Sequence, residues 1–430
     1  MATPAAVRAD IEAHASDIEA TLSTLVSTET VTGSEAPGQE VMIDAYESLG
    51  LEPDVWDPSV AELRSHPAFF ETTSFREHGY EGRPNVVARR EGGGNGPTLA
   101  ISGHIDVVPA NEGEWERDPW TLTREGDRLY GRGAADMKGG LAAALAAVDA
   151  LDRNDVTLGG DLLLQSTIEE EDGGIGGLLS VLERGYVPDA AIVPEPFGIP
   201  DIGIASAGVM YFVIRIPGRS AHAAWAYDGV SAIHESIPVI EALEDLDRER
   251  KARISFEPAV REDPQLEGHV TNINLGMMEA GDWPSTVPAE ATIRGRVGWP
   301  PGESREEVRN QIEATIDEAA TADPWLAEHP PELEWVGWQA EPHHVSEDAS
   351  IVQLSKRVAE EVTGRPGQFI GGTAGLDERF YARYYDVDVA TMGPLGERLH
   401  GADEYTTLPS LVETAQAIAT VAMEFCGVED

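Results

Sequence analysis

The strongest constraint on the fold is a set of short apolar segments that each run into charged residues. The first, residues 97–102, is typical of a buried strand and leads directly to His104 and Asp106. Side chains two residues apart on a strand leave the same face, so these two groups point in one direction. A third group, Asp136, precedes the helical pattern of residues 140–148. Because imidazole and carboxylate groups at neighbouring strand ends suit a divalent metal, the pattern predicts a metal-dependent hydrolase.

Strand and helix patterns alternate from residue 85 onward, which is typical of an α/β sheet with helical crossovers. Strands are expected over residues 85–90, 98–102, 161–166 and 190–193, and helices over residues 7–25, 139–151, 177–184, 348–362 and 408–425. Another helix should end near Leu49. Residues 57–83 show no clear periodicity and are predicted to form a surface excursion.

From about residue 208 the order changes to strand, helix, strand, strand, helix and a short final strand, which predicts a small α+β domain. These elements are expected over residues 210–216, 230–246, 272–278, 289–297, 304–320 and 333–336. A chain of 430 residues is too long for one compact core. We therefore expect a catalytic domain made of residues 1–207 and 341–430, with residues 208–340 inserted between its two parts.

The charge of the chain limits its partners. It has 77 acidic and 30 basic residues, a net charge of −47, and three of the basic residues are lysines. The acids are spread among ordinary hydrophobic segments, which favours a halophilic surface over a disordered acidic tail. Such a surface repels nucleic acid, so we expect no such partner. The lack of a long apolar run, of a secretory pattern and of a second cysteine beside Cys426 predicts a cytoplasmic protein without a membrane partner.

Further candidate ligands follow two other strand patterns. The run Glu169–Glu171 comes after residues 161–166, and Glu195 comes after residues 190–193. His400 lies in a Gly-rich loop before the last helix. Taken singly, a triple Glu is more often a solvated turn, and a loop histidine such as His400 is more often unrelated to any metal. Their shared position in one α/β pattern favours a metal site, although the triple Glu leaves the register of base and ligand open by one residue.

The order of these motifs resembles that of a known enzyme family. The segments that carry the resemblance are residues 103–109, 130–140, 169–174, 193–196, 218–222 and 399–404. They are similar to the co-catalytic dinuclear metallohydrolases, which include acetylornithine deacetylase, succinyl-diaminopimelate desuccinylase, aminoacylase and glutamate carboxypeptidases. Residues 111–120 and 281–288 resemble the acetylornithine deacetylase and desuccinylase branch most. The resemblance implies a zinc-peptidase-like catalytic domain, with a mixed sheet flanked by helices, and an inserted ferredoxin-like lid or dimerisation domain.

The resemblance also implies the ligand set. His104 and Glu195 would bind one metal ion, Glu171 and His400 would bind the other, and Asp136 would bridge the two. Histidine and carboxylate ligands without a thiolate suit zinc or cobalt, and also suit manganese.

Other residues take their expected roles from the same resemblance. Asp106 would orient His104, as carboxylates behind metal-binding histidines do. Glu170 would be the general base. His222 would reach a substrate carbonyl, across the subunit interface in dimeric members, and Asn272 would contact substrate or oxyanion from the inserted domain.

The loop over residues 371–380 resembles a substrate-carboxylate loop, in which Thr373 and above all Arg379 would contact the substrate. This loop departs from the family pattern, because two extra residues separate Thr373 from Asp377. A second departure is Gly298, which stands where the family often has an arginine, so no arginine contact is carried over to that position.

We therefore expect an amidohydrolase that removes an acetyl or succinyl group from a small N-acyl amino acid and acts as a homodimer. The alternative is a metallo-exopeptidase or dipeptidase with the same centre. An alternative of another class is an inactive metal-binding homologue that serves as a binding protein.

Overall fold

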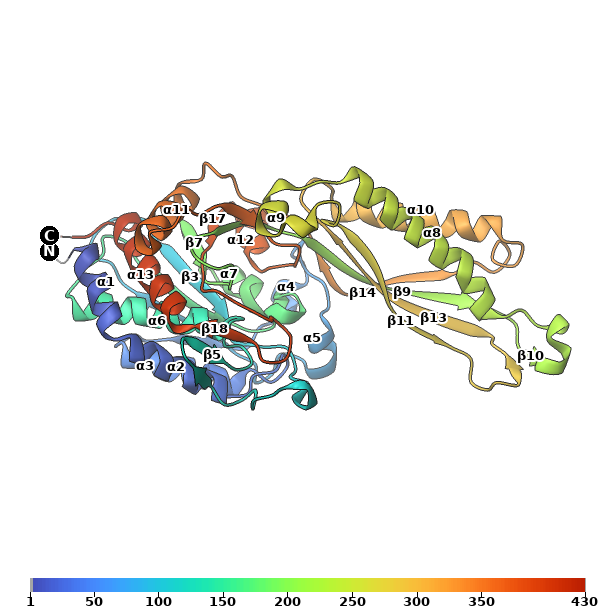
Figure 1. The fold of residues 1–430 in the computed structure, drawn as a ribbon, viewed down its shortest axis with the longest axis horizontal. Coiled ribbons are helices and arrows are strands. Elements are labelled where there is room, and N and C mark those ends of the chain that lie inside the picture. Colours follow the sequence, from blue (N-terminus) through green and yellow to red (C-terminus); the bar gives the residue numbers. More distant parts are fainter. Residues whose placement is uncertain (1–2, 430) are drawn as a thin grey trace. The chain divides into compact units, whose positions relative to one another are not determined.

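The chain divides into two compact units in the computed structural model, which describes residues 3–429 (Figure 1). The first unit comprises the residues up to Ile204, His344–Ile370 and the residues from Leu376 onward. The second unit comprises Ala205–His343 and the short segment Gly371–Gly375. Nothing in the sequence pattern sets this short segment apart from its surroundings.

A mixed sheet forms the centre of the first unit. Its strands are β1 (Asp54–Trp56), β2 (Asn85–Arg90), β3 (Leu99–His104), β6 (Leu162–Thr167), β7 (Ala190–Val193), β8 (Ile202–Ser206), β15 (His343–His344), β16 (Phe369–Gly371) and β17 (Asp388–Thr391). Their order is β1-β2-β6-β3-β7-β17-β8-β15, with β16 beside β8. β3 runs parallel to both β6 and β7, whereas β2 is antiparallel to β6. The carboxyl ends of β6, β3 and β7 therefore lie at one edge of the sheet.

Helices cover this sheet, and β3 and β6 are buried along their whole length. The helices are α1 (Pro4–Ala13), α2 (Ala15–Ser27), α3 (Ala36–Ser48), α4 (Val60–Leu63), α5 (Thr73–His78), α6 (Lys138–Arg153), α7 (Ser180–Glu183), α11 (Ser350–Thr363), α12 (Glu378–Tyr384) and α13 (Leu408–Phe425). The alanine-rich α6 packs against α13 (Figure 1). A smaller sheet has the order β18-β5-β4, with bounds Tyr405–Thr407, Arg128–Tyr130 and Thr123–Glu125.

The strands expected over residues 85–90 and 190–193 and the helix expected over residues 408–425 have these bounds in the structure. Two other expectations for the first unit were wrong. The helix expected over residues 7–25 is two helices, because His14 leaves the helical conformation and its Nδ1 lies 2.8 Å from the carbonyl oxygen of Asp10. Residues 57–83 are not a mere surface excursion, since they form α4 and α5 and bury side chains that contact the loop after β6.

The second unit has the expected α+β order. Its main elements are β9 (Gly208–Pro217), α8 (Ala232–Arg253), β11 (Asn272–Ala280), β13 (Glu290–Trp299), α10 (Arg305–Ala322) and β14 (Glu332–Ala340). The strands form an antiparallel sheet in the order β11-β13-β9-β14, which is the ferredoxin-like arrangement. The helices α8 and α10 lie over one face of this sheet (Figure 1), and their apolar side chains share one core with it. Ser304 and Glu307 form the capping box that the sequence predicts at the start of α10.

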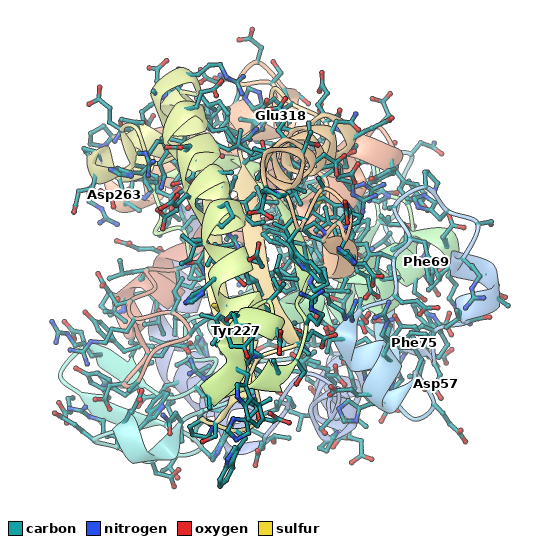
Figure 2. The ribbon with its side chains drawn as sticks, turned by 90° about the vertical axis from the view of Figure 1, so that its right-hand side faces the viewer. Asp57, Phe69, Phe75, Tyr227, Asp263 and Glu318 are labelled. Carbon is teal, nitrogen blue, oxygen red and sulfur yellow. The ribbon has the colours of Figure 1, made fainter. Side chains whose placement is uncertain are left out.

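Smaller elements complete the second unit: α9 (Glu257–Glu262), β10 (Ala221–His222) and β12 (Thr286–Val287). Acidic side chains project from the surface of the molecule, with Asp57 and Glu318 as exposed examples (Figure 2). Among the helices that the structure describes, none has the length and apolar character needed to cross a membrane.

Candidate metal centre

Three parallel strands of the first unit deliver acidic and imidazole groups to one edge of the sheet. His104 is the last residue of β3, and Glu195 follows β7 by two residues. Glu170 and Glu171 begin the single helical turn Glu170–Asp172 just after β6. Because β6, β3 and β7 are parallel neighbours, their ends bring these side chains together.

Asp136 lies between two histidines and presents one oxygen to each. Its Oδ1 is 3.3 Å from Nε2 of His104, and its Oδ2 is 3.3 Å from Nε2 of His400. Each histidine has its own glutamate: Glu195 Oε1 lies 3.4 Å from His104 Nε2, and Glu171 Oε2 lies 3.0 Å from His400 Nε2. The five side chains thus form two groups of one imidazole and one glutamate each, joined by a shared aspartate.

The donor set fits divalent cations. Nε2 of His104 is buried and has no hydrogen-bond partner among residues 3–429, although three carboxylates face it. Ligand atoms of His104, Asp136 and Glu171 also lie within 4.8 Å of one another. Burial raises the pKa of Glu171 to about 7 and that of Glu195 to about 8, and in both cases the nearby charge of Asp136 adds to the shift. So many carboxylates crowded in a buried site require a positive charge to balance them.

Glu170 differs from the ligand candidates in having no imidazole contact at ligand distance. Its Oε2 is 3.9 Å from Nε2 of His104, and its buried Oε1 has no hydrogen-bond partner within the described part of the chain. Burial raises the pKa of Glu170 well above its ordinary value, and the charges of Asp377 and Glu195 act in the same direction. A carboxylate in this state can accept a proton and give it up again.

Asp106 lies behind His104, and its carboxylate also has other partners. The imidazole N–H of His104 is donated at Nδ1 to the backbone carbonyl of Asp106, at 2.8 Å, while the carboxylate Oδ1 of Asp106 is farther away at 3.5 Å. The carboxylate also accepts the backbone N–H groups of Glu170 and Glu171, both at 3.2 Å, and the hydroxyl of Thr32 at 2.9 Å. Asp106 therefore holds the turn that carries the base and ligand candidates.

Glu169, the first member of the triple Glu, is occupied by other partners. Its buried carboxylate accepts hydrogen bonds from the hydroxyls of Thr72, Ser74 and Tyr80 and from the N–H of Gly176, at 2.6 to 2.8 Å. Its backbone has φ 65°, which turns the chain sharply after β6. These contacts support the register in which Glu170 and Glu171 face the site. Sequence reasoning missed all three hydroxyl donors, because they come from the segment that it assigns to the surface.

A second missed feature is a buried ion pair behind Asp136 and His400. Arg132 Nη1 donates to Glu404 Oε2 at 2.5 Å, and the other carboxylate oxygen accepts the backbone N–H groups of Ala135 and Asp136 at 3.0 and 3.1 Å. Nη2 of Arg132 donates to the carbonyl of His400 at 3.1 Å. We name this pair the Arg132–Glu404 clamp. Both residues lie within quoted motifs, so the signal was present, but a single sequence does not reveal that they pair.

Four other residues are predicted to belong to the site: His222, Asn272, Thr373 and Arg379. His222, Asn272 and Thr373 belong to the second unit, where His222 is exposed and its Nδ1 accepts the N–H of Ala224 at 3.1 Å. Arg379 belongs to the first unit and is 1% exposed. Its guanidinium donates to the carbonyls of Gly173 and Leu376 and to Asp377.

These contacts of Arg379 argue against the expected role as a substrate-carboxylate contact. A buried guanidinium whose donors already bind backbone carbonyls and an aspartate has little left to offer a substrate. Through the carbonyl of Gly173, Arg379 instead fixes the end of the turn that holds Glu170 and Glu171.

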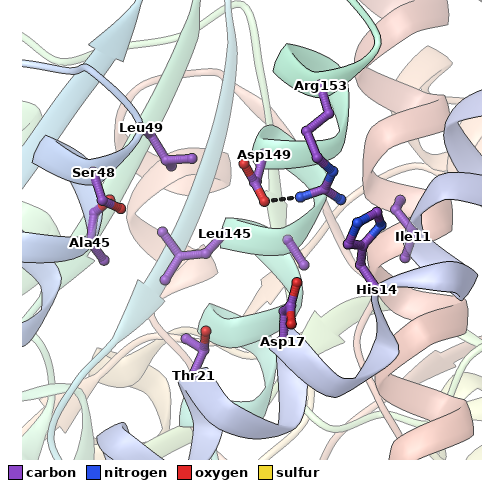
Figure 3. A pocket seen from close by; sticks show the side chains of 11 residues that line it. Ile11, His14, Asp17, Thr21, Ala45, Ser48, Leu49, Leu145, Asp149 and Arg153 are labelled. Atoms are coloured by element: carbon purple, nitrogen blue, oxygen red, sulfur yellow. Dashed lines mark hydrogen bonds and ion pairs between the residues drawn. The ribbon is translucent and has the colours of Figure 1, made fainter.

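A pocket of about 170 Å³ lies among α1, α2, α3 and α6 (Figure 3). None of its lining residues is a candidate ligand. Its Arg153 is already paired with Asp149, as Figure 3 shows, and lies 2.6 Å from Asp10. We assign no function to this pocket.

Comparison with known proteins agrees with this geometry. Residues 100–424 match the model of peptidase family M20/M25/M40. The N-formyl-4-amino-5-aminomethyl-2-methylpyrimidine deformylase of Halalkalibacterium halodurans is 28% identical over 97% of this chain and 96% of its own. The succinyl-diaminopimelate desuccinylase of Methylobacterium radiotolerans is 30% identical over 80% of this chain and 85% of its own.

Among solved structures, human carnosine dipeptidase 1 has the same fold, with a TM-score of 0.73 and 18% identity over 99% of this chain and all (100%) of that one. The family model covers well over half of the sequence, and its range includes every residue of the cluster around Asp136. The chain is a metal-dependent hydrolase of peptidase family M20/M25/M40.

Proposed function

We propose that this chain removes an acyl group, acetyl or succinyl, from the amino nitrogen of an N-acyl amino acid, with two divalent cations at its centre. One observation carries the proposal: Asp136 presents one oxygen to His104 and the other to His400, and Glu170 lies beside them with an unpartnered oxygen. This is the arrangement that an amide hydrolysis with two cations requires. The deformylase and desuccinylase among the relatives support acyl-amide cleavage as the class of reaction.

The chain's own residues have separate tasks in this reaction. His104 and Glu195 would hold one cation and His400 and Glu171 the other, with Asp136 shared between them. When bound, zinc, cobalt or manganese ions supply the Lewis acidity that activates water and polarises the amide carbonyl.

Glu170 would carry out the proton transfers of the reaction. Its Oε1 accepts the proton of the attacking water and later gives it to the nitrogen of the leaving amine. A raised pKa suits both steps, because the carboxylate then holds the proton well enough to deliver it. The hydrogen bonds from the N–H groups of Glu170 and Glu171 to Asp106 keep this carboxylate in place.

The test is a hydrolysis assay on the purified protein in molar KCl with added Zn²⁺ or Co²⁺ and an EDTA control. The panel holds N-formyl, N-acetyl and N-succinyl amino acids, dipeptides, and an N-formyl aminomethylpyrimidine. Metal-dependent release of an amine from an acetyl or succinyl amino acid supports the proposal. Two bound metal ions without any turnover would favour an inactive homologue instead.

A metallo-exopeptidase or dipeptidase with the same centre is the second candidate, favoured by the fold that the chain shares with a carnosine dipeptidase. Cleavage of dipeptides alone, with the acyl amino acids untouched, would support it.

We also propose that the protein is a homodimer formed by the second unit. Its edge strand β11 and the helix α8 expose several large apolar side chains, as does the segment between β10 and α8, where Tyr227 reaches into solvent (Figure 2). They are Trp225, Tyr227, Ile233, Ile237, Met277 and Met278, and Trp283 is exposed in the segment between β11 and β12. Sedimentation of the Met277→Glu variant tests this surface, because a dimer formed there would dissociate, whereas an unchanged mass would reject it.

His222 would then serve a substrate carbonyl in the neighbouring subunit. Because its Nδ1 accepts a hydrogen bond from Ala224, the proton resides on Nε2, which can donate to a carbonyl oxygen. Mixing the inactive variants His222→Ala and Glu170→Gln gives a direct test. Mixed dimers would regain activity if His222 acts across the interface, and would stay inactive if it acts within its own chain.

A further inference from the structure

The loop over residues 398–404, which we name the His400 loop, has an unusual backbone. Arg398, His400 and Asp403 have φ angles of 59°, 60° and 53°, in the left-handed region that side chains with a Cβ atom adopt at a cost. The side chain of His400 is 53% exposed, so packing around the imidazole does little to fix its direction. The position of this ligand candidate therefore depends on the contacts that hold the loop.

Two sets of contacts hold the backbone of the His400 loop. Glu397 and Tyr405 exchange backbone hydrogen bonds at 3.1 and 3.2 Å, and Tyr405 begins β18, which pairs with β5. The Arg132–Glu404 clamp fixes the carbonyl of His400. Between these points in the sequence stands Asp403, whose side chain is 5% exposed and needs partners of its own for its charge.

Asp403 finds these partners in a segment far away in the sequence. Its Oδ1 accepts the backbone N–H of Glu116, 287 positions earlier, at 3.2 Å and lies 3.2 Å from Nη1 of Arg117. Arg398, in the loop itself, is farther from the carboxylate, at 3.7 Å, and its side chain is 59% exposed. Arg117 is 20% exposed and is thus the closer and less solvated cation. Because this pair is shielded from solvent, salt weakens it less than it weakens an exposed pair.

Arg117 belongs to the motif over residues 111–120, to which the proposed reaction gives no task. Its guanidinium carbon lies 4.0 Å from the ring centre of Tyr130, a residue of β5. The ring centre of Trp115, in the same motif, lies 5.2 Å from the guanidinium carbon of Arg132 in the clamp. The motif therefore contacts the His400 loop at Asp403 and the clamp at Arg132, and it supports both.

We propose that Asp403, held by Arg117, is a positioning residue that fixes His400 as a cation ligand. The inference rests on the proposed function, because it requires a cation at His400, and it extends that function by giving a task to the motif over residues 111–120. Ligands held by surrounding contacts lose less order when they bind a metal ion, and removal of such contacts typically weakens metal affinity about 10- to 100-fold. The cation at His104 and Glu195, whose ligands lie at or just after the ends of β3 and β7, should not respond.

The experiment measures the two dissociation constants for Zn²⁺ by competition with a coloured chelator in molar KCl, without any substrate. His400→Ala identifies which constant belongs to the cation at His400. Asp403→Asn should raise that constant about 10-fold or more and the other constant by less than about 2-fold. Asparagine suits this test because it tolerates a positive φ angle and removes only the charge.

Two further variants and a control separate positioning from a general loss of stability. Arg117→Met should raise the same constant, and Arg117→Lys should recover part of the loss, because it restores the charge without the planar fork. Glu125→Gln is the matched control, since Glu125 pairs with the same guanidinium at 2.9 Å but is 54% exposed and lies outside the His400 loop. It should change neither constant.

An unchanged constant at His400 in Asp403→Asn, an equal rise in both constants, or the same rise in Glu125→Gln would overturn the inference. A single bound cation whose affinity His400→Ala leaves unchanged would overturn it as well. Failure of the proposed function looks different, because the unsubstituted protein would then hydrolyse no acyl amino acid. The metal titrations use no substrate, so they decide the role of Asp403 in that case too.

Discussion

Replacing Glu404 by glutamine should destabilise the first unit, because it leaves the buried guanidinium of Arg132 without a negative charge beside it. The substitution keeps an oxygen for the N–H groups of Ala135 and Asp136, but it places an amide N–H₂ against the guanidinium of Arg132. The side chains of both partners are at most 2% exposed, so water cannot replace the lost charge. Breaking such a buried pair from one side costs about 3–5 kcal/mol.

The assay is urea unfolding of the metal-free protein at fixed molar salt, with Glu404→Gln, Arg132→Met and the double variant. Because both single changes break the same pair, the double variant should cost less than their sum by about 2 kcal/mol. The exposed pair Arg124–Glu19, also at 2.5 Å, is the matched control, and Glu19→Gln should cost at most about 1 kcal/mol. The reasoning is refuted if Glu404→Gln costs no more than Glu19→Gln, or if the two clamp substitutions are additive.

Three further predictions concern the centre and the surface. Glu170→Gln should lower kcat about 10²–10⁴-fold with metal content unchanged, as measured by turnover and elemental analysis, and full activity would place the base elsewhere. Because the pKa values of Glu171 and Glu195 are raised to about 7 and 8, both carboxylates hold protons near neutral pH that a cation must displace. Metal affinity should therefore rise between pH 6 and pH 8, with proton release visible by calorimetry in buffers of different ionisation enthalpy, and a pH-independent affinity would contradict this. The net charge of −47 predicts a melting temperature that rises from low to molar KCl, where the Debye length falls to about 3 Å, and equal melting temperatures would remove the halophilic interpretation.

The sequence predicted the parts of the site that follow from strand ends. His104 and Glu195 follow apolar runs whose length and composition identify them as strands, and parallel strands bring their carboxyl ends to one edge. The order of strands and helices in the second unit was also predictable, because apolar residues recur with a different period in a strand and in a helix. The capping box at Ser304 is also a local signal, readable within four residues.

Interactions between distant segments were not predictable in this way. Glu169 depends on hydroxyls that lie about ninety positions earlier, in a segment without periodicity. The sequence places Asp106 behind His104, but it gives no sign that the same carboxylate accepts the backbone N–H groups of Glu170 and Glu171. Arg379 matched a motif in type but is turned inward, a direction that depends on packing around Gly173 rather than on spacing.

The two halves of the centre differ in their access to solvent. Each half has one histidine, one glutamate and one oxygen of Asp136, but the side chain of His104 is 1% exposed whereas that of His400 is 53% exposed. A chelator reaches a cation through its exposed ligands, so two chemically similar positions should empty at different rates. Stopped-flow mixing with a coloured chelator should then show a fast phase and a slow phase of equal amplitude, and the cation at His400 would be the one that exchanges with the metal pool of the surrounding medium.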